Sequence, residues 1–249
     1  MTVSDMATRC PDNEEDDVMA DPRPDVSEAP EPDPIEAAKS RLLDAALMHV
    51  PFDGWSEKTL QRAIEDSGVD EGLAQLAFPR GTIDLAVWFH DRADNQLEAW
   101  LATGALEGMK IREKVAAAVR KRLELVSGDK DSVRYAASLF ALPVYAGEGA
   151  RAIWRTADII WTGIGDTSDD ANWYTKRAIL SGVYSSTVLY WLGDTSEGFE
   201  DTWAFLDRRI AGVMQFEKLK AQVNGNPLGR LLMTGPNLVS RMVKPPRRA

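Results

Sequence analysis

The chain has 249 residues, of which 44% are hydrophobic, enough for one sizeable core. Its net charge of −10 is uneven, because residues 1–36 alone carry −10 while residues 218–249 carry +7. The single cysteine, Cys10, excludes an intrachain disulfide, and no stretch approaches the roughly 18 apolar residues of a transmembrane helix. The N-terminus lacks the pattern of a secretion signal or transit peptide, so we expect a cytoplasmic protein of a bacterium.

Residues 1–34 are rich in proline and acidic residues, which predicts a disordered leader. From Ile35 apolar residues follow helical spacing, and Pro51 and Gly54 are expected to end this first helix. A serine at position 56 and an aspartate at position 70 are suitable N-caps for a second helix and for a short third helix over residues 71–77. Residues 35–80 are therefore predicted to form a helix-turn-helix-like unit.

The next segment, residues 81–220, is also predicted to be helical. One long helix is expected up to about Leu106, followed by amphipathic helices over 109–126, 131–141, 149–161, 170–192 and 199–220. The expected connections, at 127–129, 147–149 and 193–195, contain Gly, Asp, Ser or Thr. Because no alternating strand pattern exceeds a few residues, the sequence predicts an all-α bundle.

Residues with catalytic or metal-binding chemistry are scarce. The two histidines, His49 and His90, lie in separate predicted helices, and no cysteine lies in the predicted folded region. The chain has no Glu-x-x-His motif for a di-iron site, no glycine-rich phosphate loop and no nucleophile elbow. We therefore expect a protein without enzymatic activity, metal or cofactor, with a hydrolase hidden in the bundle as an open alternative.

Residues 41–85 resemble the N-terminal domain of the TetR family of regulators. The similar residues are Arg41–Ala46, Gly54–Trp55, Ser67–Val69, Phe78–Pro79 and Asp84–Leu85. The resemblance implies an all-helical homodimer that pairs through its last two long helices and encloses an apolar ligand. However, the helix in the DNA-reading position begins with two acidic residues and offers no Lys, Arg, Tyr or His. We expect no nucleic-acid binding, and a ligand-responsive TetR-like regulator is the alternative.

A second resemblance is carried by two aromatic-rich motifs in residues 169–209. These are Asn-Trp-Tyr-Thr-Lys-Arg at 172–177 and Phe-Glu-Asp-Thr-Trp-Ala-Phe-Leu at 199–206. They resemble the ubiquinone (coenzyme Q) biosynthesis accessory-protein family, the ninth of the coenzyme Q series. The resemblance implies a TetR-like homodimer that binds an isoprenoid quinone intermediate or a phospholipid at a membrane surface. It also implies presentation of the quinone to the di-iron hydroxylase of demethoxyubiquinone, and we expect peripheral association with a bacterial inner membrane.

The first of these motifs is also a candidate partner-binding surface. Trp173, Tyr174 and Arg177 fall three and four residues apart on one predicted helix, so they share one neighbourhood. We expect an exposed patch, because a buried guanidinium would need a costly buried partner and these residue types are enriched at hot spots. The alternative is aromatic core packing. The predicted partner-binding set is Asp158, Trp161, Asp170, Trp173, Tyr174 and Arg177.

The basic C-terminal segment, residues 221–249, is a candidate membrane contact. Apolar and basic residues alternate there in helical clusters, interrupted at Gly235 and Pro236, as expected of an amphipathic helix on a membrane surface. The alternatives are a helix packed on the bundle or an unstructured tail. The predicted membrane-binding residues are Leu228, Arg230, Leu231, Leu232, Leu238, Val239, Arg241 and Met242. Residues 81–220 are then the expected lipid-binding and dimerisation domain.

Overall fold

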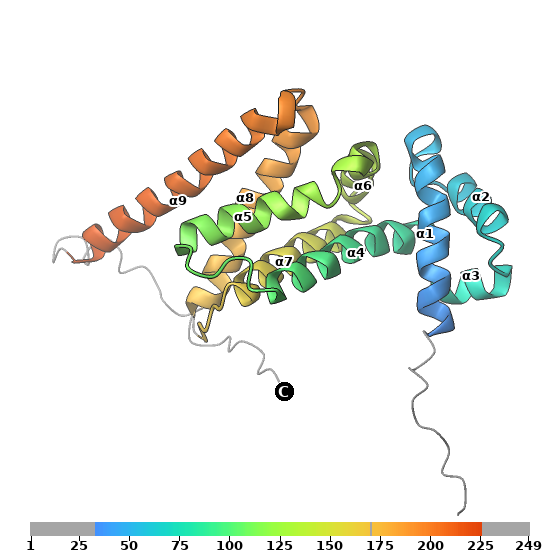
Figure 1. The fold of residues 1–249 in the computed structure, drawn as a ribbon, viewed down its shortest axis with the longest axis horizontal. Coiled ribbons are helices and arrows are strands. Elements are labelled where there is room, and N and C mark those ends of the chain that lie inside the picture. Colours follow the sequence, from blue (N-terminus) through green and yellow to red (C-terminus); the bar gives the residue numbers. More distant parts are fainter. Residues whose placement is uncertain (1–32, 170, 226–249) are drawn as a thin grey trace, which may run out of the picture. The chain divides into compact units, whose positions relative to one another are not determined.

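The computed structural model describes residues 33–169 and 171–225, and over 214–225 only the helical backbone. This part of the chain is helical and contains no strand, which confirms the all-α fold class (Figure 1). The helices are α1 (Pro34–Asp53), α2 (Glu57–Ser67), α3 (Glu71–Ala77), α4 (Thr82–Ala102), α5 (Ile111–Glu124), α6 (Lys130–Phe140), α7 (Ala146–Gly163), α8 (Ala171–Gly193) and α9 (Glu200–Gly225), with short 3₁₀ turns η1 (Ser127–Asp129) and η2 (Glu197–Phe199). The leader predicted at residues 1–34 lies almost entirely outside the described residues, as does the tail beyond residue 225.

The first three helices pack together, with α2 and α3 both contacting α1. The predicted caps are confirmed: the Ser56 side chain accepts a hydrogen bond from the Thr59 amide, and the Asp70 side chain accepts from the Gly72 amide at 2.9 Å. Gly68 ends α2 in the left-handed region, with φ of 61°. Local capping chemistry thus fixes where α2 and α3 begin.

Two expected breaks in the helices are wrong. Pro51 lies inside α1, which continues to Asp53 and ends at Gly54, whose φ is 65°. The expected connection over residues 147–149 lies inside α7, which starts at Ala146. A Cβ added to Gly149 would lie 2.8 Å from the Cβ of Phe140. This glycine therefore serves the close approach of α6 and α7, not a turn.

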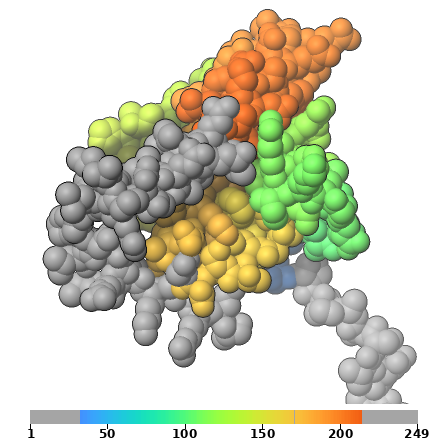
Figure 2. All heavy atoms as spheres, turned by 90° about the vertical axis from the view of Figure 1, so that its left-hand side faces the viewer, coloured from blue at the N-terminus to red at the C-terminus, as the bar shows by residue number. Residues whose placement is uncertain are grey.

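The remaining helices form the body of the described chain. The helix α7 contacts α4, α5, α6 and α8, and α9 packs against α8 and α5. Figure 2 shows α5 and the connection before it (green) alongside α9 (orange), with the end of α7 and the start of α8 (yellow) also at the surface. No helix in the described ranges has both the length and the apolarity needed to cross a membrane.

The turn between α8 and α9 is held by one carboxylate. Asp194, 7% exposed, accepts hydrogen bonds from the Ser196 amide and from both the amide and the hydroxyl of Thr202. Burial alone would raise the pKa of Asp194, but the side-chain and backbone hydrogen bonds from Thr202 and Ser196 outweigh it and lower the pKa to about 2. The carboxylate thus acts as the cap that starts α9.

Candidate functional site

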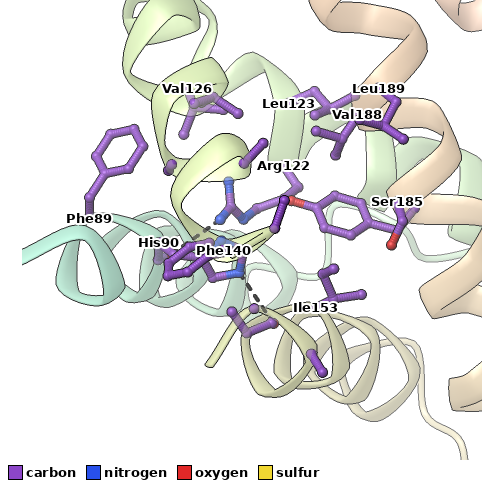
Figure 3. A pocket seen from close by; sticks show the side chains of 18 of the residues that line it. Phe89, His90, Arg122, Leu123, Val126, Phe140, Ile153, Ser185, Val188 and Leu189 are labelled. Carbon is purple, nitrogen blue, oxygen red and sulfur yellow. Dashed lines mark hydrogen bonds between the residues drawn. The ribbon is translucent and has the colours of Figure 1, made fainter. Parts of the chain in front are cut away.

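The body encloses an apolar pocket of about 390 Å³ among α4, α5, α6, α7 and α8 (Figure 3). This volume lies at the small end of the range of about 300–1,000 Å³ that is typical of ligand sites. The wall formed by α6, α7 and the connection between them consists largely of small residues. They are Ala136, Ala137, Ala141, Ala146, Gly149, Ala150 and Ala152. Bulkier apolar side chains complete the lining, namely Phe89, Leu123, Val126, Val133, Phe140, Ile153, Val188 and Leu189.

One side of the pocket is polar. We call it the polar wall and define it as His90, Arg122 and Tyr184, which line the pocket, together with Asp94 and Thr156 behind them. The Arg122 Nε donates to Asp94 Oδ1 at 2.7 Å, and its Nη2 donates to the His90 carbonyl at 3.1 Å. Figure 3 shows the guanidinium of Arg122 beside His90. Arg122 is 2% exposed and Asp94 is fully buried, so they form an interior ion pair.

The hydrogen bonds of Thr156 define the tautomer of His90. The Thr156 Oγ1 lies 2.9 Å from Asp94 Oδ1 and 2.9 Å from His90 Nε2. A hydroxyl has one hydrogen and an ionised carboxylate can only accept, so Thr156 donates to Asp94 and accepts from His90. The proton of the neutral imidazole is therefore on Nε2.

Two of the titratable side chains that line the pocket, His90 and Tyr184, are held in their uncharged forms. Burial lowers the pKa of His90 well below its usual value, and the nearby charge of Arg122 lowers it further. Burial also raises the pKa of Tyr184. At neutral pH the polar wall therefore contains one ion pair, a neutral imidazole and a protonated phenol.

The polar wall was not predicted from the sequence. Its signal was present as charges on otherwise apolar helix faces: Asp94 falls between Ala93 and Leu97 on α4, and Arg122 falls beside Val119 and Leu123 on α5. Such a charge needs a partner on a neighbouring helix. Asp94 and Arg122 are 28 residues apart in sequence and lie on different helices, so the helical spacing of apolar residues does not identify their pairing.

The predicted partner surface is only partly exposed. Arg177 is 1% exposed, which makes the expectation of an exposed guanidinium wrong. Its Nε donates to Asp158 at 2.6 Å, its Nη1 donates to Asp166 at 3.1 Å, and its Cζ lies 3.9 Å from the Trp173 ring centroid. Asp166, which is not among the predicted residues, supplies the buried partner that a buried guanidinium needs.

Next to this buried arginine lies an aromatic cluster, defined as Trp154 of α7 with Trp173 and Tyr174 of α8. The Trp173 and Tyr174 rings meet edge to face at 4.7 Å, and Trp154 lies 6.1 Å and 6.4 Å from them between ring centroids. All three side chains are half-buried. Trp161 donates to the Lys176 carbonyl at 3.0 Å, and Asp170 lies outside the described residues. A partner-binding role of this surface stays a prediction.

The helix α8 exposes apolar side chains near its end. Leu189 and Tyr190 of α8 are 67% and 40% exposed, and the Tyr190 ring stacks on Phe205 of α9 at 4.5 Å. The membrane-binding residues predicted between Leu228 and Met242 lie outside the described residues. Within the described ranges, no three His, Cys, Asp or Glu residues converge as a metal site would require.

Comparison with known proteins connects this site to one family. The COQ9 family model matches residues 146–217, which cover α7, α8 and most of α9. The ubiquinone biosynthesis protein COQ9, mitochondrial, of Drosophila melanogaster is 33% identical over 193 residues, 76% of this chain and 59% of that protein. Its counterpart in Rattus norvegicus is 30% identical over 202 residues, 78% of this chain and 64% of that protein. The chain thus spans about three-fifths of the length of these relatives.

The fold has a solved counterpart. The crystal structure of the TetR transcriptional regulator from Nitrosomonas europaea superposes with a TM-score of 0.59 over 70% of this chain and 95% of that chain. The sequence identity is 17%, so this likeness concerns the fold alone.

The comparisons also correct the expected location. The matching COQ9 relatives are named as mitochondrial proteins, which contradicts the expected bacterial cytoplasm or inner membrane. The resemblance expected from the motifs at 172–177 and 199–206 is confirmed: this chain resembles the COQ9 family and has a TetR-like fold.

Proposed function

We propose that this chain is a non-enzymatic accessory protein of ubiquinone biosynthesis. In this proposal it binds an isoprenoid quinone intermediate and presents it to the di-iron hydroxylase that acts on demethoxyubiquinone. The observation that carries the proposal is the apolar pocket among α4–α8, part of whose lining lies in the region that matches the COQ9 model. Such a pocket fits a hydrophobic cargo better than it fits a water-soluble metabolite.

The edge of the pocket supports a long-chain ligand. Leu189 lines the pocket and is 67% exposed, so the lining continues onto the surface. The connection from α6 to α7, which contributes Ala141 and Ala146 to the lining, also exposes Leu142 at 48% and Val144 at 72%. A ligand longer than the pocket can therefore emerge over apolar side chains.

Three further surfaces have roles in this proposal. The aromatic cluster, through Trp173 and Tyr174, contacts the hydroxylase, since half-buried aromatic residues are typical of hot spots. The surface formed by Tyr190 of α8 and the Phe205 ring of α9 on which it stacks pairs two copies into a homodimer. The basic segment over residues 221–249 brings the protein to an anionic membrane surface, from which the quinone is taken.

The alternative, a DNA-binding regulator, is supported only by the TetR-like fold. The helix α3, which takes the DNA-reading position in that fold, begins at Glu71 after the Asp70 cap. It also presents Leu76, which is 67% exposed. Acidic and apolar side chains at this position oppose phosphate contacts, so this surface favours the carrier over the regulator.

Mass spectrometry of the lipids that purify with the protein tests the proposal. We expect protein made in a ubiquinone-producing host to retain isoprenoid quinone intermediates. Ala150→Trp, which adds a ring at the pocket lining, should abolish this retention. Ala102→Trp, at an exposed position at the end of α4, is the matched control and should retain the lipid. Isoprenoid levels no higher than those of an unrelated control protein would contradict the proposal.

A further inference from the structure

The helix α6 is attached to the body less firmly than the other helices around the pocket. Its buried residues are Ser132 and Ala136, whereas α4, α5, α7 and α8 each bury five or more. The apolar face of α6 borders the cavity instead, through Val133, Ala136, Ala137 and Phe140. A movement of α6 would therefore expose little apolar surface that is now packed against protein, which is typical of elements that open locally.

One edge of α6 lies beside the end of α8, and we call the boundary between α6 and residues 188–193 the seam. The helix α6 packs mainly on α1 and α7, while α8 packs mainly on α7 and α9. On the α8 side Val188 and Leu189 line the pocket, and Leu189 is 67% exposed. The pocket therefore reaches the surface at the seam.

Two cations of α6 bridge the seam, and we call Lys130 and Arg134 the latch. Lys130 Nζ donates a hydrogen bond to the Asp194 carbonyl at 2.6 Å, and Arg134 Nη2 donates one to the Leu192 carbonyl at 2.9 Å. Carbonyls at the C-terminal end of a helix lack partners within the helix and lie at the negative end of its dipole. Both latch bonds are therefore favourable, and both join α6 to α8 through long side chains.

The surroundings of the latch make it firm but breakable. Lys130 Nζ lies 5.3 Å from the ring centroid of Trp191 and 4.9 Å from that of Phe199, and such contacts with aromatic faces add to its hydrogen bond. The Arg134 side chain is 53% exposed, so water competes for its bond. When the seam opens, water can solvate both cations and the freed carbonyls.

The other contacts of α6 do not cross the seam. Trp55 Nε1, in the connection after α1, donates to the Ser132 carbonyl at 3.0 Å. At the last turn of α6, Phe140 lies so close to Gly149 of α7 that an added Cβ would be 2.8 Å from the Phe140 Cβ. The helix can therefore separate from α8 while it stays attached to the connection after α1 and to α7.

We propose that α6 is a lid, held on the end of α8 by Lys130 and Arg134, and that a ligand enters and leaves the pocket through the seam when these bonds break. The inference rests on the proposed function for the identity of the ligand, whereas the opening is a property of the unloaded protein. Because every entry and every exit requires the same opening, the latch controls both rates and leaves the affinity to the pocket lining.

Reaction of a thiol inside the pocket measures the opening without any ligand. Cys10→Ser removes the natural cysteine, and Ala152→Cys puts one in the pocket lining at a position that is 8% exposed. The rate of its reaction with dithionitrobenzoate is followed on the full-length, delipidated protein. In this background the latch variant, Lys130→Met with Arg134→Met, should react about tenfold faster, because two charge-assisted hydrogen bonds that oppose opening are lost.

A matched control removes the same two charges elsewhere. In Arg120→Met with Lys121→Met, both cations come from α5, outside the lining of this pocket. Each also lies over a tryptophan ring, Trp203 at 4.8 Å for Arg120 and Trp100 at 5.8 Å for Lys121. The control should react at the rate of the unmodified latch.

A second measurement separates a lid from general loosening of the fold. Stopped-flow binding of the uncharged apolar dye N-phenyl-1-naphthylamine gives the association and dissociation rates. The latch variant should raise both rates by about tenfold and leave the Kd unchanged within about twofold. A variant that is merely less stable would instead bind the dye more weakly.

An unchanged thiol reaction rate in the latch variant, or an equal increase in the control, would overturn the lid. Failure of every variant to bind the dye would count against the proposed function, while the thiol reaction still decides on the lid. If the double variant does not fold, Arg134→Met alone provides the test, with an increase of about threefold expected from the loss of one partly exposed bond.

Discussion

Replacing Arg177 by methionine should destabilise the protein strongly, although the sequence predicts an exposed surface for this residue. The substitution keeps an unbranched side chain and removes the guanidinium from Asp158, Asp166 and the Trp173 ring. Breaking one side of a buried ion pair typically costs about 3–5 kcal/mol, because the remaining charge stays buried without compensation.

The structure places the expected loss near the lower end of that range. The Asp158 side chain is 29% exposed, so water screens part of its charge. The Asp166 side chain is only 4% exposed, but Lys176 Nζ still lies 2.6 Å from it after the substitution. We therefore expect a loss of about 3 kcal/mol. For a protein of this size that corresponds to a fall in Tm of about 6–12 °C.

Thermal unfolding monitored by circular dichroism measures this shift, and Arg120→Met is the matched control. Arg120 also pairs with a carboxylate, Glu124 at 2.8 Å, and also lies over a tryptophan ring, that of Trp203 at 4.8 Å, but its side chain is 53% exposed. Exposed pairs contribute about 1 kcal/mol or less, so its Tm should fall by less than about 4 °C. Equal Tm values for the two variants would refute the argument that burial makes the Arg177 interactions strong.

Four further outcomes follow from the surfaces and from Asp194. Tyr174→Ala should weaken hydroxylase binding in a pull-down by about thirtyfold while retaining lipid, whereas normal binding would remove this side chain from the partner surface. Because the folded pKa of Asp194 is about 2, the stabilisation by its carboxylate is complete above about pH 4 and is lost as the pH falls from about 4 to 2. The free energy of unfolding of Asp194→Asn should therefore change less with pH in this window than that of the unmodified protein. Removing residues 226–249 should reduce sedimentation with anionic liposomes at low salt without changing the Tm of the body; undiminished sedimentation would exclude the tail. Finally, no duplex DNA site should be protected at physiological salt, since Asp70 and Glu71 head α3.

Much of the fold could be predicted from the sequence because its signals are local. Side-chain caps at Ser56 and Asp70 and left-handed glycines at 54 and 68 act within a few residues, so they mark helix ends correctly. Gly149 misled the prediction for the opposite reason. Its role depends on Phe140 of the preceding helix, and a glycine that permits helix packing looks in sequence like a glycine that permits a turn.

The candidate site was less predictable because its parts come together only in three dimensions. Helical spacing correctly put Trp173, Tyr174 and Arg177 in one neighbourhood, but spacing does not say whether a neighbourhood is exposed. Whether Arg177 is buried depends on Asp166, which lies in the connection between α7 and α8. Asp166 is eleven residues before Arg177 in sequence and accepts a hydrogen bond from it. The same limitation concealed Trp154, which is contributed to the aromatic cluster by a different helix.

The small residues that α6 and α7 contribute to the pocket imply a conflict between thermal stability and ligand binding. Seven alanine and glycine positions leave a space that larger apolar side chains could fill, and filling a cavity is among the commonest ways to stabilise a protein. Random substitutions that raise the melting temperature should therefore be enriched among those that abolish binding. A screen for stability alone would select against the pocket. The small residues of α6 and α7 are therefore retained only while the space that they leave is needed to bind a ligand.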